Sequence, residues 1–235
     1  MINKLIIIGA SGHGKVAADC AEASRRFSEI RFLDQAYPEQ KKNAHWDVVA
    51  HADEAMKYVA SDTLFFVAIG NNAIRAKVTA ELLAQHCSFA TLVHPSAHVS
   101  RHSEIGLGSL ICANATVNIA SRIGQGSIIN TAASVDHDCV VGDFVHVAPG
   151  SRCAGKVKVE GQGVVGIGAR PLDQHVAPSD RFEFHGSPLW FDQARLQRCF
   201  PDTSTPPIGH PITSPSGTPA SRSPTEPSRV SAHLG

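Results

Sequence analysis

Two histidines in the middle of the chain have neighbours that suit acid–base chemistry. His137 stands between two carboxylates in the stretch Val135-Asp-His-Asp-Cys139. His146 ends the following stretch, Val141-Gly-Asp-Phe-Val-His146. A carboxylate beside an imidazole can fix its tautomer, and a general base needs a fixed tautomer. The alternative interpretation is an imidazole that only faces solvent. The residues by themselves leave both interpretations open.

A glycine-rich turn near the amino terminus suits an anionic ligand. The sequence Gly9-Ala-Ser-Gly-His-Gly14 follows an apolar run and precedes a predicted helix. Free backbone N–H groups at such a turn, together with the helix N-terminus, can bind a phosphate. The spacing is GxxGxG rather than the GxGxxG of dinucleotide-binding proteins, so NAD is weakly supported. A tight turn without a ligand is the alternative.

Two further strand ends carry polar residues of the same kind. Asp34 ends a second predicted strand, where such sheets place an acceptor for a ribose or base, although it could instead cap a turn. Gly70-Asn-Asn72 ends a third predicted strand. The carboxyl ends of parallel strands meet at one edge of a sheet, and open α/β sheets bind ligands there. The three strand ends together predict a nucleotide pocket.

A strict six-residue repeat occupies the centre of the chain. Val or Ile recurs at every sixth position from Val93 to Val165, except for Cys153, and the residue four positions further on is small almost throughout. Neither a helix period nor a strand period is six, whereas a parallel β-helix of hexapeptides has this period. Three hexapeptides close one triangular coil, and stability comes from stacking the coils. A coincidental spacing in an ordinary sandwich is the alternative.

These patterns divide the chain into four parts. Strand, turn and helix signals alternate over residues 1–90, which predicts a small α/β domain with a parallel sheet. The helix expected over residues 15–26 has Val16, Ala17, Cys20 and Ala23 on one stripe, and the helix expected over residues 73–86 has Ile74, Val78, Leu82 and Leu83 facing inward. The repeat predicts a β-helix domain over residues 91–169. Residues 170–200 hold scattered aromatic side chains and are expected to be irregular. Residues 201–235 are rich in Pro, Ser and Thr, so this tail is expected to be disordered.

Composition argues against several classes of partner. The formal net charge is +0, so no global basic field attracts nucleic acid. The apolar run at the amino end is too short for a signal peptide or a membrane helix. The six cysteines form no CxxC pair and no zinc-ribbon spacing. We therefore expect reduced thiols in a cytoplasmic protein without a membrane or nucleic-acid partner.

Taken together, the motifs resemble the sialic-acid O-acetyltransferase and UDP-amino-sugar N-acetyltransferase family (NeuD/PglD-like). The matching stretches are KLIIIGASGHGKV, FLD, AIGNNAIRAK, HPSA, NTAASVDHDCVVGDFVHVAPGSRCAG and VGIGA, all within residues 1–169. The resemblance implies a Rossmann-like nucleotide-sugar-binding domain, a left-handed β-helix and a homotrimer with active sites between protomers. It also implies acetyl transfer from acetyl-CoA, without a metal, to an amine or hydroxyl of a nucleotide sugar or related sugar, as in polysaccharide biosynthesis.

The same resemblance assigns roles to individual residues. His137 would take the proton from the acceptor, and Asp138, where relatives often carry glutamate, would strengthen it as a base. His146 and Ile167 would contact acetyl-CoA. The nucleotide sugar would contact the strand ends and the glycine-rich turn, at Gly12, His13, Gly14, Asp34 and Gly70.

The carboxyl-terminal part departs from the family pattern. Relatives continue with further hexapeptides and finish near a GVPA-type motif, whereas here the pattern stops after Ala169, as a frameshifted or truncated reading frame would produce. The alternative function is therefore a catalytically impaired nucleotide-sugar-binding relative, truncated in its coenzyme A site. A zinc hydrolyase of the γ-type carbonic anhydrase kind is a third alternative. It needs three convergent histidines, and the late coils offer two.

Overall fold

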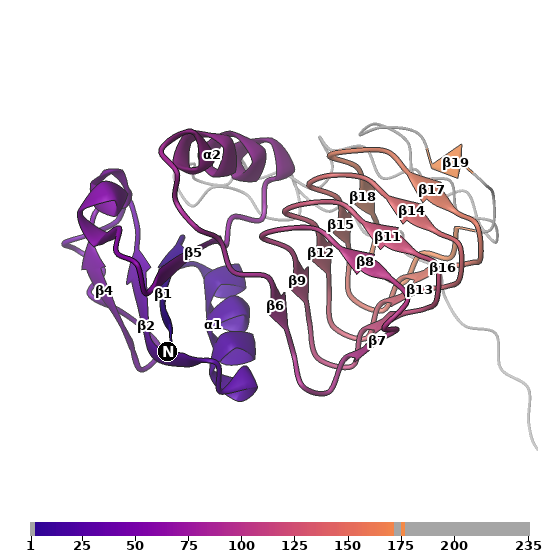
Figure 1. Cartoon of the computed structure of the whole chain (residues 1–235), viewed down its shortest axis with the longest axis horizontal. Coiled ribbons are helices and arrows are strands. Elements are labelled where there is room, and N and C mark those ends of the chain that lie inside the picture. The colour runs from indigo at the N-terminus through magenta and orange to yellow at the C-terminus, as the bar shows by residue number, and fades with distance from the viewer. Residues whose placement is uncertain (1–2, 172–174, 177–235) are drawn as a thin grey trace, which may run out of the picture.

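An α/β domain is followed by a prism of stacked coils in the computed structural model of the chain (Figure 1). The structure describes residues 3–171 and 175–176. Most of the segment that we expect to be irregular, and all of the tail that we expect to be disordered, lie outside the described residues. Among the described residues, no helix combines the length and the apolar composition that crossing a membrane requires.

The N-terminal sheet has the strand order β3-β4-β2-β1-β5. Its parallel strands are β1 (Asn3–Ile8), β2 (Phe27–Leu33), β4 (Trp46–Ala50) and β5 (Thr63–Val67). The central strand β1 is an apolar run buried on both faces, as parallel sheets require. The edge strand β3 (Lys42–Asn43) is antiparallel to β4, so the sheet is mixed rather than wholly parallel. The connection between β3 and β4 consists only of Ala44 and His45, and only an antiparallel pair can be joined by so short a connection.

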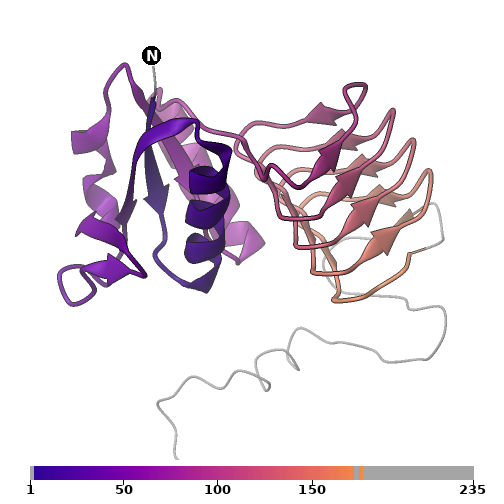
Figure 2. The same cartoon turned by 90° about the horizontal axis from the view of Figure 1, so that it is seen from below.

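Helices cover both faces of this sheet (Figure 2). One face packs against α1 (Gly12–Ser24), and the other against the 3-10 helix η1 (Ala52–Tyr58) and α2 (Asn72–Ala84). Helix α1 also contacts the first strand of the β-helix and therefore lies between two layers. Its buried side chains are small for this reason, because small side chains let the helix approach both neighbours. They are Ala17, Ala18, Cys20 and Ala21.

Three parallel sheets form the faces of the left-handed β-helix. The first face consists of β7 (His98–Val99), β10 (Thr116–Val117), β13 (Ser134–Val135) and β16 (Arg152–Cys153). The second consists of β8 (Glu104–Ile105), β11 (Arg122–Ile123), β14 (Val140–Val141), β17 (Lys158–Val159) and β19 (His175–Val176). The third consists of β6 (Leu92–Val93), β9 (Leu110–Ile111), β12 (Ile128–Ile129), β15 (His146–Val147) and β18 (Val164–Val165).

Two kinds of residue fill the prism. The Val and Ile residues of the repeat stack on their copies one coil away, for example Val117 on Val135. The small residues include buried serines that join successive coils. The hydroxyl of Ser127 donates to the carbonyl oxygen of Gly142 at 2.8 Å and accepts the N–H of Val145 at 3.0 Å. The sequence shows that these positions must be small, and the structure adds that their hydroxyl groups satisfy buried backbone groups.

The ladder of strands continues past the predicted end of the repeat at residue 169. Earlier pairs are one full coil apart, such as Val141 with Val159, but Val159 pairs with Val176, one residue earlier than the repeat predicts. The hexapeptide spacing is therefore lost near Pro171, although the parallel pairing is not.

Arg75 of α2 joins the two domains. Its side chain is only 1% exposed. Its guanidinium donates to the carbonyl oxygens of Gly126 (2.7 Å) and Phe144 (3.0 Å) in the β-helix. Within the N-terminal domain it donates to the carbonyl oxygen of Ile69 and to the side-chain oxygen of Asn72, both at 2.8 Å. Burial lowers the pKa of Arg75 to about 10, so the group remains a cation at neutral pH.

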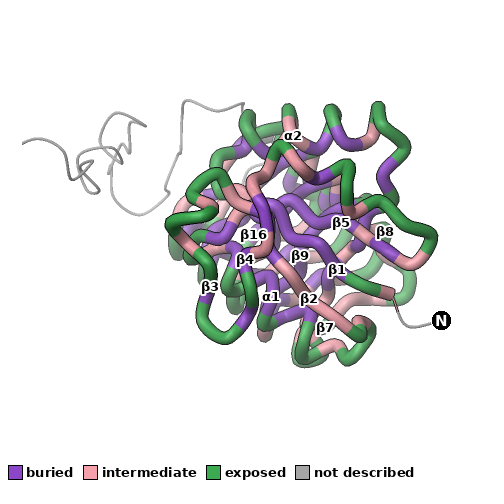
Figure 3. Tube along the Cα trace, turned by 90° about the vertical axis from the view of Figure 1, so that its left-hand side faces the viewer, coloured by how far each residue is buried: buried purple, intermediate pink, exposed green. Residues whose placement is uncertain are grey.

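The inward face of α2 matches the expected apolar stripe of Ile74, Val78, Leu82 and Leu83 only in part (Figure 3). Leu82 is buried, and Val78 and Leu83 are partly buried against the same apolar cluster. Ile74 is 50% exposed, whereas Asn72, Arg75 and Thr79 are buried together with Leu82. The reason is that α2 faces the β-helix backbone as well as the sheet, and backbone carbonyl groups require polar partners.

Replacing Arg75 with methionine should destabilise the protein by about 3 kcal/mol or more. Hydrogen bonds from a charged donor contribute roughly 1.5–3 kcal/mol each, and the variant leaves buried carbonyl oxygens of both domains without a donor. Urea denaturation measures the change. Lys77→Met, which removes an exposed cation from the same helix, is the matched control. Equal stability of the two variants would contradict the role given to Arg75.

Candidate active site

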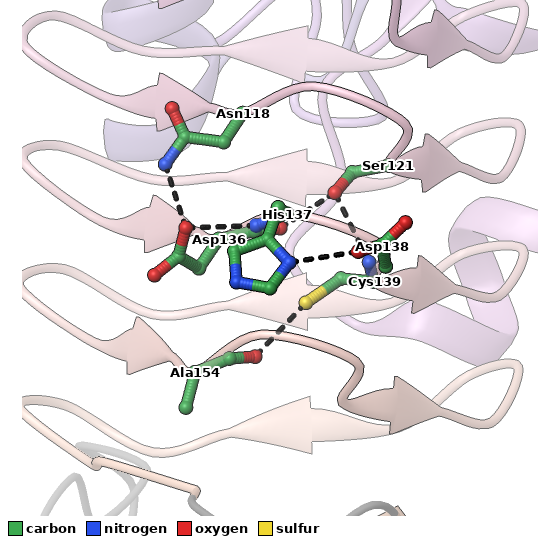
Figure 4. Close-up of polar contacts among 7 residues, drawn as sticks. All are labelled: Asn118, Ser121, Asp136, His137, Asp138, Cys139 and Ala154. Atoms are coloured by element: carbon green, nitrogen blue, oxygen red, sulfur yellow. Dashed lines mark hydrogen bonds and ion pairs between the residues drawn. The ribbon is translucent and has the colours of Figure 1, made fainter.

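His137 lies at the corner of the prism that follows β13 (Figure 4). Its Nδ1 is 2.8 Å from Oδ2 of Asp138, and its side chain is 51% exposed. A carboxylate accepts hydrogen bonds, so Nδ1 carries the proton of the neutral ring and Nε2 keeps a free lone pair. Asp138 has a φ of 60°, a turn conformation that aspartate tolerates better than most residues. The corner therefore presents an oriented imidazole to solvent.

Asp136 fixes the turn from the other side. Its Oδ1 accepts the backbone N–H of His137 at 2.8 Å and the Nδ2 of Asn118 at 2.9 Å. The same two hydrogen bonds lower the pKa of Asp136, so the carboxylate stays ionised. Asn118 lies one coil before Asp136, and Ser121 of that coil donates to the carbonyl oxygen of Asp136 (Figure 4). Sequence reasoning did not single out Asn118, although the one-coil spacing is a signal that could have found it.

His146 lies near another histidine, His13, at the boundary between the domains. His13, at the start of α1, and His146, on β15, have ring centroids 6.4 Å apart. Burial, followed by the charge of Arg75, lowers the pKa of His13 to about 4. Burial also lowers the pKa of His146 to about 4, with smaller contributions from His13 and Arg75. Both rings are therefore neutral at pH 7.

Asn130 determines the tautomer of His146. Its side-chain oxygen accepts the N–H of Thr131 at 2.8 Å, which leaves its Nδ2 facing Nε2 of His146 at 2.9 Å. Since an amide NH₂ only donates, Nε2 is the acceptor and the proton lies on Nδ1. Nε2 of His13 is buried without a hydrogen-bond partner among the described residues. The sequence placed these histidines in different sites, whereas the structure brings them together.

A cavity of about 820 Å³ lies at the carboxyl ends of β1, β2 and β5. The predicted residues Asp34 and Gly70 line it, as does Lys77 of α2. Both oxygens of Asp34 also hold the glycine-rich turn and the chain after β2, since they accept N–H groups of Ala10 (2.6 Å) and Ala36 (2.8 Å). Asp34 thus lies at the cavity formed by the strand ends and also caps a turn, so it shows features of both alternatives that the sequence left open.

Gly12, His13 and Gly14, which were expected to contact the nucleotide sugar, do not line this cavity. A Cβ on Gly14 would lie 2.1 Å from the carbonyl oxygen of Gly9 and 3.1 Å from the ring of Phe32, so this glycine permits close packing of α1 on the sheet. Gly12 has open space around it. His13 is turned toward His146.

The predicted site residues therefore occupy separate places in one chain. His137 follows a strand of the first face of the prism, whereas His146 lies on a strand of the third face. Ile167 is 77% exposed in the turn that follows β18. The cavity belongs to the N-terminal domain. One chain by itself brings together Asp34 with Gly70, and His13 with His146, but not His137 with either pair.

The described cysteines are free and buried, namely Cys20, Cys87, Cys112, Cys139 and Cys153. Burial raises the pKa of Cys153 to about 12, with a smaller effect of Cys139. Cys199 lies outside the described residues. In the part of the chain that the structure describes, no three His, Cys, Asp or Glu side chains form a group that could hold a metal ion.

The two half-buried histidines at the domain boundary, His13 and His146, should make stability depend on pH. Unfolded histidine has a pKa of about 6.5, so between about pH 6.5 and pH 4 the unfolded chain binds protons that the folded protein does not. The free energy of unfolding should therefore fall as the pH falls through this window, by up to about 3 kcal/mol for each histidine.

Urea denaturation between about pH 7 and pH 5 measures this slope. His13→Gln and His146→Gln should each flatten it, whereas the exposed His98→Gln should not. Identical slopes for all three variants would contradict the neutral state of the half-buried pair.

Comparisons with known proteins find relatives with the same fold. The PglD N-terminal domain family matches residues 4–82. GDP-perosamine N-acetyltransferase of Escherichia coli O157:H7 is 37% identical over 105 residues, which are 45% of this chain and 48% of that protein. UDP-N-acetylbacillosamine N-acetyltransferase of Bacillus subtilis strain 168 is 33% identical over 113 residues, 48% of this chain and 52% of that protein. The chain thus spans about half the length of these curated relatives.

Solved structures show the same architecture over a longer stretch. The acetyltransferase domain of PglB from Neisseria gonorrhoeae FA1090, in complex with acetyl coenzyme A, is 37% identical with a TM-score of 0.71, covering 74% of this chain and 84% of that one. PerB from Caulobacter crescentus, in complex with CoA and GDP-perosamine, is 33% identical with a TM-score of 0.67, covering 72% and 80%. These matches confirm the resemblance read from the motifs. The chain belongs to the family of hexapeptide-repeat sugar acetyltransferases that carry a PglD-type N-terminal domain.

Proposed function

We propose that the protein transfers an acetyl group from acetyl-CoA to an amine of a nucleotide-linked amino sugar. The observation that carries this proposal is the oriented imidazole of His137, held at 2.8 Å by Asp138 on an exposed corner of the β-helix. The structural relative from Neisseria gonorrhoeae was solved with acetyl coenzyme A, and the relative from Caulobacter crescentus with CoA and GDP-perosamine. Both curated relatives are named as N-acetyltransferases, which favours an amine over a hydroxyl as acceptor.

His137 acts as general base in this proposal. Its Nε2 takes a proton from the acceptor amine while the nitrogen attacks the thioester carbonyl carbon, so that a C–N bond forms and the C–S bond then breaks. The electron pair of the C–S bond leaves with the thiolate of coenzyme A, which accepts a proton. Asp138 holds the ring and stabilises the imidazolium, and backbone N–H groups stabilise the oxyanion. The base lies at the surface, so an acceptor can reach Nε2 from solvent.

The cavity of the N-terminal domain is the proposed site of the nucleotide. It lies at the strand ends where open α/β sheets bind such ligands, and its volume suits a molecule of that size. Lys77 lines the cavity and supplies a cation there, although its Nζ lies 3.8 Å from Oε1 of Glu81. Asp34 would act mainly by holding the turn, because both of its oxygens already accept backbone N–H groups.

A homotrimer with sites between protomers completes the proposal. His137 and the proposed acetyl-CoA contacts His146 and Ile167 belong to different parts of the prism, so a second chain is needed to bring them together. Ile119, one coil before His137, and Val140 on β14 are exposed apolar side chains that such an interface would cover. A cytoplasmic location belongs to the same proposal, since acetyl-CoA is a cytoplasmic metabolite and the described thiols are free.

Removing the base should abolish most of the transfer without removing the substrates. His137→Ala should lower kcat by about 10²–10⁴-fold, the usual contribution of a positioned general base. Thiol release from acetyl-CoA, measured with GDP-linked and UDP-linked amino sugars, gives the rate. His98→Ala removes an exposed histidine of another coil and is the matched control. Normal turnover by His137→Ala would overturn the proposed mechanism.

Calorimetry separates this function from its alternative. A catalytically impaired nucleotide-sugar-binding protein would bind the nucleotide sugar but not acetyl-CoA. The proposed enzyme should bind both, and His137→Ala should retain both affinities. Nucleotide-sugar binding by the unaltered protein without any acetyl-CoA binding would therefore favour the alternative.

A further inference from the structure

Gly155 lies beside the imidazole of His137 in the next coil of the β-helix. The carbonyl oxygen of His137 accepts the N–H of Lys156 at 2.9 Å, and Val135 pairs with Cys153, so residue 155 stacks on residue 137. Side chains at stacked positions of a parallel ladder normally lie side by side. Here the ring of His137 lies over the coil that carries Ala154 (Figure 4). The ring therefore occupies the place where a side chain at position 155 would begin.

The distances show how little room is left. A Cβ built on Gly155 would be 2.6 Å from both Cε1 and Nε2 of His137 and 3.2 Å from Cδ2. Carbon atoms in contact are normally about 3.5–4.0 Å apart, so even alanine would overlap the ring. The nearest atoms include Nε2, which is the nitrogen with the free lone pair.

The backbone does not explain this glycine. Several glycines at the corners of the coils have left-handed φ values, as Gly126 (60°) and Gly150 (69°) do, and these values favour glycine by themselves. Gly155 is not among the residues with positive φ, whereas its neighbour Lys156 has a φ of 66°. A side chain at position 155 is thus compatible with the backbone and is excluded by the imidazole.

We propose that Gly155 is a positioning residue, which keeps the imidazole of His137 over the next coil by leaving that space empty. This inference rests on the proposed function, in which Nε2 of His137 is the base. A methyl group at position 155 would push the ring outward and break the 2.8 Å hydrogen bond to Asp138. The ring is half-exposed and can swing into solvent, so the fold itself should tolerate the change.

Gly155→Ala should lower kcat by about 10²-fold, the loss that a displacement of roughly 1 Å can cause, with little change in KM for acetyl-CoA. Gly161→Ala is the matched control, because a Cβ there would lie 3.4 Å from the nearest atom, the carbonyl oxygen of Asp143, and Gly161 has no positive φ. Both variants should keep the melting temperature of the unaltered protein. An unchanged kcat for Gly155→Ala would overturn the proposal.

A double-mutant cycle shows whether Gly155 acts through His137. In the His137→Ala background, Gly155→Ala should have no further effect, because the displaced ring is already gone. Additive losses would mean that the methyl group obstructs substrate directly, which would overturn the positioning role. The cycle therefore separates a displaced base from a blocked site.

Nuclear magnetic resonance of the His137 ring tests the inference independently of activity. Long-range ¹H–¹⁵N spectra of the unaltered protein should show a proton on Nδ1, and Gly155→Ala should shift these ring signals and lose the preference for that tautomer. Ring signals that stay the same in Gly155→Ala would overturn the inference. If the unaltered protein transfers no acetyl group, the proposed function fails, while these spectra still decide whether Gly155 positions the ring.

Discussion

The stacking of one coil on the next positions the groups that surround His137. Each coil places a residue beside its counterpart one coil away, so a side chain at one level is oriented by side chains from the levels before and after it. Asn118 from the preceding coil holds the turn of His137, and Gly155 from the following coil leaves space for the ring. Because the stack is joined by buried serine hydroxyls and aliphatic columns, the backbone positions of neighbouring coils are held relative to one another.

The junction between the domains depends on a buried cation without a carboxylate. Arg75 donates only to carbonyl and amide oxygens in the described structure, on both sides of the boundary. Its positive charge near His13 and His146 opposes their protonation, and burial acts in the same direction. The carbonyl group of Ile69, a residue that lines the cavity at the strand ends of the N-terminal sheet, is one of its partners. One side chain therefore links that cavity to the strand region that carries His146.

Two expectations about the helices failed in part, and they share a physical cause. Apolar stripes on α1 and α2 were predicted as if each helix had one neighbour, the sheet. Both helices also contact the β-helix, so α1 buries a face of small residues and α2 buries polar residues beside its apolar ones. Val16, expected on the inward stripe of α1, is exposed, as is Ile74 on α2. The spacing of apolar residues along a helix predicts the face that packs against one apolar surface. It carries no information about a second surface that the helix also contacts.

The sequence alone determined the coil architecture, the corner histidine with its carboxylate and the strand ends that meet at a cavity. These features depend on local spacing, since a repeat of six sets the coil and adjacent residues such as His137 and Asp138 meet wherever the turn allows. Only the tertiary structure decided that His13 turns to His146, that Arg75 joins the domains and that Gly155 must lack a side chain. Those relations arise where separate segments pack against each other, and the rotation of a side chain there depends on neighbours that no local pattern specifies.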